Sequence, residues 1–444
     1  MVTFNSIPNT IRAPGVYVEV DSSKSRYGLA LKLFRGVLIG SKTSAGSMTT
    51  LTRYRANSLD EVISYAGAGS ILAEMAAAWF ASNKFTELWI VDAGDGTTAQ
   101  VFTITTTVTT AVAGVLSLWV AGHRVPVSVT AGQAQNSIAA AINAAINADT
   151  SLPVTSTVAT NVVTVTAKNR GDVTADLDLR LNYAASETTP GGVTVVIAST
   201  VTGAGDPTLG SSLWSALGED QYDVLAVAWN SATLVTAVQT ELISRWGPLR
   251  ACDGMAFFGL KATLANAQSY GATRNSQFLS VLAMNASPTW TPAIAASYAA
   301  VSAFYLNADP ARPLNGLPLD YVLAPVVASR FVLLERDTLL KTGIATYTVD
   351  SGGFVKIDRA ITTYQRTSAG VADIAYLDVT SQATVSFMRW SYASEFEAKY
   401  SRHKLADDST NFGAGQPVMT PALARAESMA IFRAWELLGL AEDA

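Results

Sequence analysis

The sequence predicts an α/β (α+β) host domain whose mixed sheet is covered by helices, carrying a mostly β inserted domain and an extended N-terminal arm. Three observations support this prediction. Short apolar runs alternate with helical patterns on either side of residues 97–205, which favours a sheet covered by helices. Within 97–205 the composition changes to alternating Thr, Val and Ala. Residues 11–21, IRAPGVYVEVD, have the period-two pattern of a strand without an adjacent hairpin partner.

We therefore expect three parts. Residues 1–22 form the arm, residues 23–96 and 206–444 form a discontinuous α/β core domain, and residues 97–205 form a β-rich inserted domain that protrudes from it. The two boundaries of the insertion, DAGDGTT and GAGDP, are similar glycine-aspartate turns. This is expected if both ends of an inserted domain leave the host at neighbouring points.

The arm contains a strand-like segment made of Pro14, Gly15, Val16, Tyr17, Val18, Glu19 and Val20. Its three valines fall on one side of an extended chain, and the tyrosine and glutamate fall on the other. The proline cannot donate a hydrogen bond to a ladder, and the glycine loosens the entry to the strand. A free edge of this kind needs an acceptor sheet. Composition alone does not distinguish a strand exchanged between subunits from an ordinary edge strand of its own domain.

The first half of the host is predicted as β-α-β. Residues 36–40 and 88–93 are apolar strands. Between them, Ser58-Leu59-Asp60-Glu61 is a capping box that starts one helix, which Gly67 is expected to end. A second helix is expected over residues 70–83.

The remaining elements follow in chain order. In the insertion, Ile138, Ile142 and Ile146 recur every fourth residue and predict a helix. Further strands are expected at 222–229, 255–259, 278–284, 344–350, 354–358 and 360–365, and further helices at 231–246, 261–270, 291–306, 331–341 and 379–400. A last helix starts at Pro421 after the N-cap Thr420.

Composition excludes several classes of function. Charged residues make up 15% of the 444 positions, against about 25% in a typical domain. Proteins with so little surface charge often bury surface against copies of themselves. The net charge of -5 argues against nucleic-acid binding, because no basic stripe displaces phosphate counterions. We expect no signal peptide and no membrane span, since no apolar run reaches about 18 residues.

The residues that carry chemistry are scarce. Only two histidines occur: His123 is expected to be structural, and His403 with Asp407 resembles a solvated helix end more than a metal site. The carboxylates at 92–96 lack the further ligands of a calcium loop. The single cysteine, Cys252, is interpreted as inert packing. We therefore predict no catalytic, metal or cofactor-binding site, and the chain is not expected to be an enzyme.

The C-terminal helix carries two stripes at helical spacing. The apolar stripe consists of Ile431, Ala434, Trp435 and Leu438, and the second stripe of Arg425, Met429, Arg433 and Glu436. In an isolated domain the second stripe faces water. In an assembly its arginines would instead meet an acidic partner surface.

The order of these features resembles contractile tail sheath proteins, with the closest likeness to the branch of Mu-like phages and phage-derived tailocins. The likeness is carried by APGVYVEVD, by SLDEVISYAG and AAAWFASN leading into LWIVDA, by AAAINAAINAD, and by LLKTGIATYTVDSGGFVKIDRAITTYQ. It extends over nearly the whole chain.

The resemblance implies a non-enzymatic subunit without cofactors that polymerises with itself as stacked hexameric rings around a tail tube and then contracts, driving the tube through a bacterial envelope for genome delivery. Its implied partners are the tail tube, baseplate and tail terminator proteins, with no nucleic acid bound. Its implied location is the contractile tail of a virion that is assembled in the host cytoplasm. The resemblance also implies that the arm is exchanged between subunits and that the Arg425 stripe faces the tube.

Alternatives remain at this stage. A tailocin sheath delivers no genome, an adhesin would use residues 97–205 as a receptor-binding domain, and an α/β hydrolase is the third alternative. The family usually continues past the final helix into a C-terminal exchange strand, whereas this chain stops at LLGLAEDA. Either this chain is shortened or the exchange differs; we expect the former, in which case the acceptor strand lies outside this sequence.

Overall fold

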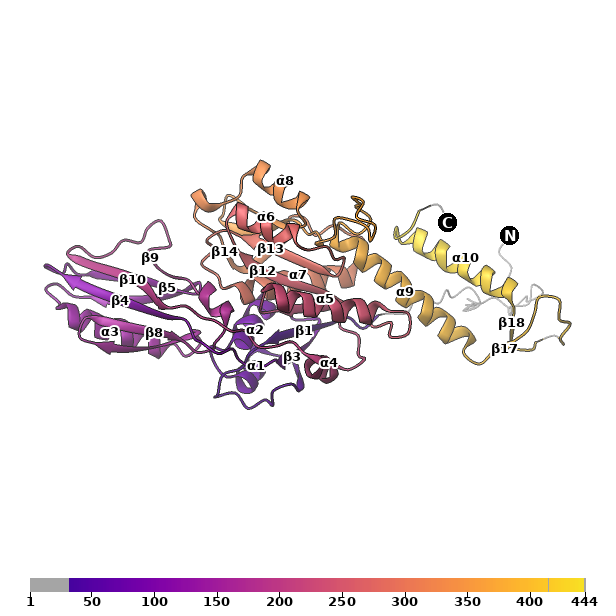
Figure 1. Cartoon of the computed structure of the whole chain (residues 1–444), viewed down its shortest axis with the longest axis horizontal. Coiled ribbons are helices and arrows are strands. Elements are labelled where there is room, and N and C mark those ends of the chain that lie inside the picture. Colours follow the sequence, from indigo (N-terminus) through magenta and orange to yellow (C-terminus); the bar gives the residue numbers. More distant parts are fainter. Residues whose placement is uncertain (1–31, 414, 443–444) are drawn as a thin grey trace, which may run out of the picture. The chain divides into compact units, whose positions relative to one another are not determined.

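The computed structural model describes residues 32–413 and 415–442, in two compact units. The larger unit comprises residues 34–386, and the smaller one contains the described residues from Phe387 onward. Figure 1 shows the mixed α/β architecture that the sequence predicts. The predicted arm, Pro14 to Val20, lies outside the described residues.

A six-stranded mixed sheet forms the centre of the larger unit. All neighbouring strands are parallel except the edge pair β2–β3. The order across the sheet is β13 (Leu279–Met284), β12 (Met255–Lys261), β11 (Val224–Val227), β1 (Arg35–Gly40), β3 (Glu87–Asp92) and β2 (Arg53–Ala56). Its inner strands are almost continuously apolar and buried, as expected of a parallel sheet that is covered on both faces.

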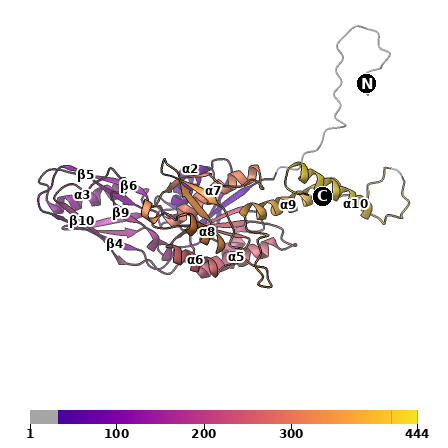
Figure 2. The same ribbon diagram turned by 90° about the horizontal axis from the view of Figure 1, so that it is seen from above.

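Helices cover both faces of this sheet. Helix α2 connects β1 to β3, whereas α5 and α6 connect β11 to β12 and β12 to β13 in the opposite direction across the sheet, and crossovers of the usual right hand then place these helices on opposite faces. Figure 2 separates the pair α2 and α7 from the pair α5 and α6. Helix α7 packs on β11, β12 and α2. The helices are α1 (Leu59–Ala66), α2 (Ile71–Ser82), α4 (Ser211–Leu217), α5 (Ala232–Trp246), α6 (Leu264–Ala272) and α7 (Thr291–Ala308).

Strand β1 and helix α2 approach each other closely at Gly36. A Cβ atom at this position would lie 2.3 Å from Cη2 of Trp79, a fully buried side chain. Gly36 pairs with strands on both sides, Leu88 of β3 and Val224 of β11. Because the sheet cannot move away on either side, only glycine fits this position without displacing the indole.

Residues 97–205 contain two antiparallel sheets and one long helix. The helix α3 (Gln135–Ala148) packs on strands of both sheets, with Ile138, Ile142 and Ile146 fully buried. At the ends of this segment, Thr97 N donates to Gly205 O over 2.9 Å. The strands are β4 (Val101–Val108), β5 (Gly114–Val120), β6 (His123–Val129), β7 (Val154–Ala159), β8 (Val162–Ala167), β9 (Leu179–Leu181) and β10 (Val193–Val201), with the 3₁₀ turn η1 (Asp172–Asp176).

A three-stranded sheet and a helix complete the larger unit. The sheet order is β14 (Pro318–Leu323), β16 (Phe354–Arg359) and β15 (Thr346–Val349). Helix α8 (Leu333–Lys341) packs on β15 and α6, after the 3₁₀ turn η2 (Val327–Ser329).

Helix α9 (Val379–Tyr400) begins in the larger unit and ends in the smaller one. The smaller unit also contains the short strands β17 (Lys404–Leu405) and β18 (Val418–Met419) and helix α10 (Pro421–Leu437). The predicted start of α10 is confirmed, because Thr420 accepts a hydrogen bond from Leu423 N and Pro421 occupies the first turn.

Some element predictions are wrong. Residues 360–365 form no strand: Thr362 N donates to Leu377 O and Thr363 N to Leu279 O, so this backbone bonds to two different segments instead of one ladder. Helix α6 begins at Leu264 and not at Lys261, because Lys261 completes β12 and Thr263 caps the helix. Strands β2 and β14 were not predicted, since RYRA and PLDYVL lack a clear alternation.

We predict that Gly36→Ala destabilises the larger unit by about 1–3 kcal/mol, the usual cost of overpacking a core. Gly210→Ala is the matched control, because nothing lies within 4 Å of a Cβ at that position. Urea unfolding followed by tryptophan fluorescence measures both variants. Equal midpoints for Gly36→Ala and Gly210→Ala would contradict the account of this contact.

Candidate assembly surfaces

α/β domains usually bind small molecules at the carboxyl ends of their parallel strands. In this chain, residues at those strand ends form hydrogen bonds with other segments of the same chain. Asp92 at the end of β3 accepts hydrogen bonds from Lys42 N and Gly94 N, each over 3.1 Å. At the end of β12, Lys261 Nζ donates to the carbonyl oxygen of Asp176, 2.7 Å away in η1. Trp229, directly after β11, is fully buried. Lys261 thereby holds the 97–205 segment at this edge of the sheet, and Asp92 holds the adjacent loops.

The residues considered for chemistry have structural surroundings. His123 contacts the buried carboxylate of Glu74. Cys252 is buried, and burial raises the pKa of its thiol, which disfavours the reactive thiolate. Within residues 32–413 and 415–442, no group of three or more His, Cys, Asp or Glu side chains could hold a metal ion. None of the helices in this part of the chain is long and apolar enough to cross a membrane.

Helix α10 packs on the second half of α9 within the smaller unit. Ile431 and Trp435 are 3% and 4% exposed, and Trp435 Nε1 donates to Ser391 Oγ over 2.9 Å. Glu427 accepts hydrogen bonds from Lys399 Nζ over 2.5 Å and from Tyr400 over 2.9 Å. One side of α10 is thereby fixed to α9.

The second stripe of α10 lies on the side turned away from α9. The side chain of Arg425 is 78% exposed and lies 4.0 Å from Asp408, Met429 is 57% exposed, Arg433 is exposed and Glu436 is half-buried. The apolar stripe is buried at Ile431 and Trp435, but its predicted last member, Leu438, is exposed because the helix ends there. The exposed side of α10 thus combines two arginines with apolar side chains.

The smaller unit also presents an open sheet edge. Strands β17 and β18 pair in parallel, Lys404 with Val418 and Leu405 with Met419. Among the described residues, this sheet has two strands only, so each of them has one outer edge without a strand partner there. Such edges are templates for a further strand.

The larger unit carries an exposed apolar surface at the start of α8, which we call the α8 shoulder. It consists of Val326, Val327, Val332, Leu333 and Leu334, which are 45%, 76%, 61%, 70% and 76% exposed. Single exposed apolar residues are normal, but a contiguous group marks an interaction surface.

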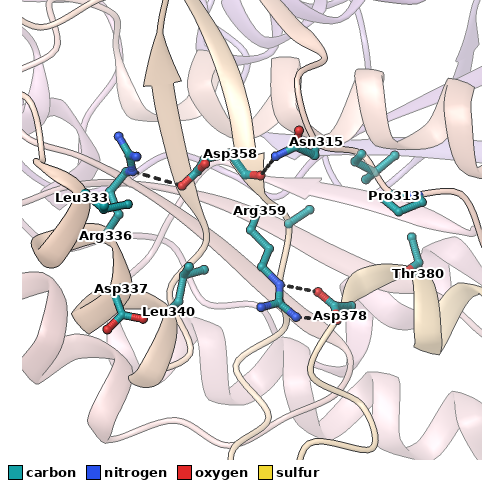
Figure 3. A pocket seen from close by; sticks show the side chains of 12 residues that line it. Pro313, Asn315, Leu333, Arg336, Asp337, Leu340, Asp358, Arg359, Asp378 and Thr380 are labelled. Carbon is teal, nitrogen blue, oxygen red and sulfur yellow. Dashed lines mark hydrogen bonds and ion pairs between the residues drawn. The ribbon is translucent and has the colours of Figure 1, made fainter.

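A cavity of about 500 Å³ opens beside the α8 shoulder, with Leu333 in its lining (Figure 3). Two arginines point across it toward carboxylates: Arg336 Nε lies 3.1 Å from Asp358, and Arg359 makes two hydrogen bonds of 2.9 Å to Asp378. Since both guanidinium groups already have carboxylate partners, the cavity suits a protein surface better than a charged small molecule.

The sequence pattern did not indicate the α8 shoulder. It predicted a helix over 331–341 but assigned no buried face. The available signal was the density of large apolar residues in VVASRFVLL, which exceeds what a short surface helix needs to anchor itself. Only Leu339 of α8 is buried.

Comparison with known proteins gives consistent results. A sequence model described as "Phage tail sheath protein central domain" matches residues 210–363. The tail sheath protein of the Mu-like prophage FluMu from Haemophilus influenzae (strain ATCC 51907 / DSM 11121 / KW20 / Rd) is 34% identical over 444 residues, which cover 100% of this chain and 91% of that protein.

Solved structures with similar folds are more distant. The sheath tail protein of Desulfitobacterium hafniense is 12% identical, with a TM-score of 0.48 over 96% of this chain and 89% of that one. A sheath complex of the extracellular contractile injection system PVC, in its contracted state, is 11% identical, with a TM-score of 0.46 over 98% of this chain and 85% of that one. Because the identity to the FluMu protein extends over the entire chain, the chain belongs to the phage tail sheath protein family, in its Mu-like branch.

Proposed function

We propose that this chain is the repeating subunit of a contractile tail sheath. Copies stack as hexameric rings around a tail tube, and the polymer shortens to drive the tube through a bacterial envelope. The structural observation that supports this function best is the α8 shoulder, where five large apolar side chains close together in the sequence are left exposed. Fully burying one exposed leucine contributes about 1.5–3 kcal/mol, so covering Leu333 and Leu334 would contribute substantially to a contact between copies.

Helical polymers need heterologous contacts, in which one surface of a copy meets a different surface of the next. We assign the α8 shoulder to one side of such a contact. Contraction further requires two packings of the same subunits, the extended one being kinetically trapped. Contacts made by apolar surfaces suit this requirement, because they are not directional and tolerate a change of packing angle.

We assign the predicted arm, Pro14 to Val20, to exchange between copies. The outer edges of β17 and β18 support this assignment, since an added strand would find backbone donors and acceptors there. About four to six ladder bonds at ~0.5–1.5 kcal/mol each give only a few kcal/mol per arm. Repetition over many linked subunits is what would keep the polymer connected during contraction.

We assign the second stripe of α10 (Arg425, Met429, Arg433 and Glu436), with its three exposed members and the half-buried glutamate, to the tail tube. Its two arginines would favour an acidic tube surface and fix the register of the sheath on it. The proposed partners are therefore other copies of this chain, the tube protein, and the baseplate and terminator proteins at the two ends of the tail.

We propose no catalytic role, because the strand ends that would form a pocket in an α/β enzyme bind other parts of the chain. Residues 97–205 are proposed as an inserted domain, with the paired ends Thr97 and Gly205 in support. The proposed location is the tail of a virion or of a phage-derived particle. The sheath of a genome-delivering phage and the sheath of a tailocin remain alternatives. The genes next to this one would distinguish the two.

We predict that Leu333→Glu combined with Leu334→Glu prevents polymerisation. Burying two carboxylates in the contact would raise the concentration needed for assembly at least tenfold, which corresponds to about 1.4 kcal/mol. Leu249→Glu is the control, because Leu249 is 99% exposed and lies outside the α8 shoulder. Sedimentation and negative-stain microscopy measure assembly, and circular dichroism checks folding. Normal cylinders from the double variant would exclude the shoulder from the contact.

Deletion of residues 1–21 is expected to leave a folded subunit that forms no ordered polymer, because the copies lose the exchanged strand. Thermal unfolding measures the fold, and electron microscopy measures the polymer. Intact cylinders from the shortened chain would refute the role of the arm.

Arg425→Glu combined with Arg433→Glu is expected to reduce co-sedimentation with the tube protein by about tenfold or more, since like charges would then meet across the contact. Arg402→Glu combined with Lys84→Glu, two exposed cations outside α10, changes the net charge by the same amount and provides the control. If both variants bind the tube equally, α10 does not face it.

A further inference from the structure

The 97–205 segment is joined to the rest of the larger unit by a cluster of three side chains around one buried carboxylate. Glu74 of α2 is a carboxylate with only 3% of its side chain exposed. His123, at the start of β6, places Nε2 3.1 Å and 3.2 Å from its two oxygens. Tyr321 of β14 donates its hydroxyl to Glu74 Oε1 over 3.0 Å. The carboxylate therefore binds two side chains from elements that lie far apart in the sequence.

A buried carboxylate needs compensation for the hydration that it loses. The attraction of Glu74 raises the pKa of His123 and outweighs the opposing effect of burial, with a smaller contribution from Asp149 at the end of α3. Burial and the nearby Glu74 raise the pKa of Tyr321, so its hydroxyl stays a donor. His123 is thus the member of the cluster that changes charge near neutral pH.

The other charged groups nearby bind elsewhere. On β6, Arg124 Nε donates to Glu187 over 2.6 Å. Lys168 Nζ donates to the carbonyl oxygens of Ala68 and Thr150 over 3.2 Å and 2.7 Å. Asp320, next to Tyr321 on β14, is exposed. Of the groups named here, His123 is therefore the one that brings a positive charge to Glu74, while Tyr321 contributes a neutral hydrogen bond.

The turn that carries His123 also sits directly on the host. Gly122, with φ +93°, lies in this turn, and a Cβ there would be 3.5 Å from both Leu323 at the end of β14 and Thr289. Thr289 Oγ1 in turn accepts a hydrogen bond from Leu323 N over 2.8 Å. The charged contact and the packed turn therefore form one attachment point.

We propose that His123, Glu74 and Tyr321 form a protonation-dependent latch that holds the β5–β6 turn of the 97–205 segment on α2 and β14. When His123 is charged, the latch is closed by an ion pair and two hydrogen bonds to one carboxylate. When it is neutral, the carboxylate keeps only uncharged partners, and the turn is held less firmly. The inference depends on these contacts alone and does not require that the chain polymerises.

The direction of the pH dependence follows from the raised pKa of His123. Below its ordinary value of about 6.5, the imidazole is charged in both the folded and the unfolded chain, and the stabilisation by the latch is fully present. As pH rises through the higher pKa of the folded state, the proton leaves and this stabilisation is lost.

The titration of His123 can be measured directly, because the chain has only two histidines. Deuterium exchange at the imidazole Cε1–H, followed by mass spectrometry of peptides, reports each histidine separately in monomers and in polymers. We expect a midpoint above 6.5 for His123 in the full chain. In Glu74→Gln the midpoint should fall, because only burial and the smaller attraction of Asp149 then act on the imidazole. A midpoint that is the same in both proteins would overturn the proposal.

Amide exchange of residues 114–129 tests whether this charge holds the turn. In the wild-type chain, protection of this segment relative to intrinsic rates should decrease between pH 6 and pH 9. His123→Gln keeps a donor but carries no charge, so its protection should be low at both pH values. Tyr321→Phe removes a hydrogen bond without changing a charge. The protection of residues 114–129 should therefore decrease by the same factor at pH 6 and at pH 9 in this variant. Protection that falls equally with pH in wild type and His123→Gln would contradict the latch.

Discussion

The burial of helix α2, in which eight of the twelve residues are buried, is the constraint on which the larger unit depends. Strand β1 approaches it so closely at Gly36 that Trp79 leaves no room for a side chain. Helix α7 packs along it, and β14 contacts it as well. Its first turn is held from the 97–205 segment, where Asn169 Oδ1 accepts a hydrogen bond from Ile71 N over 3.0 Å. Because parts from the whole length of the larger unit converge on α2, that unit must form its core cooperatively.

The same arrangement leaves the outer surface of the subunit, and not the strand ends, as the place for contacts with partners. With the segment after β3 bound over the carboxyl ends of the sheet, the position at which α/β folds commonly place a ligand is occupied by the chain itself. Among the surfaces left uncovered are the apolar side chains of the α8 shoulder, the arginine-bearing side of α10 and the outer edges of β17 and β18. These are the features of a subunit that completes its buried surface by assembly. They also explain how a chain with 15% charged residues can use so much uncharged surface.

Sequence patterns predicted the helices and strands whose apolar residues recur at a regular spacing or whose ends carry a capping residue. The strands around Val37 and Leu225, the isoleucine ladder of α3 and the capped start of α10 are examples, because local spacing and capping chemistry decide them. The backbone of residues 360–365 forms hydrogen bonds with two other segments of the chain, at Leu377 and Leu279. A local sequence pattern carries no information about these partners, so the strand prediction for 360–365 was wrong. The partner of His123 was also unpredictable, since Glu74 lies 49 positions away. The second stripe of α10 was predicted from its helical spacing. The α8 shoulder could not be predicted in this way, because the exposure of its apolar side chains is known only from the folded structure.

The central claim is that this chain assembles into a sheath, and cryo-electron microscopy of the purified protein, alone and with its tube protein, tests it most directly. The account predicts hollow cylinders of stacked six-fold rings in which the α8 shoulder lies between copies and α10 lines the inner wall. A chain that stays a monodisperse monomer with and without the tube protein, at concentrations where its fold is intact, would contradict it.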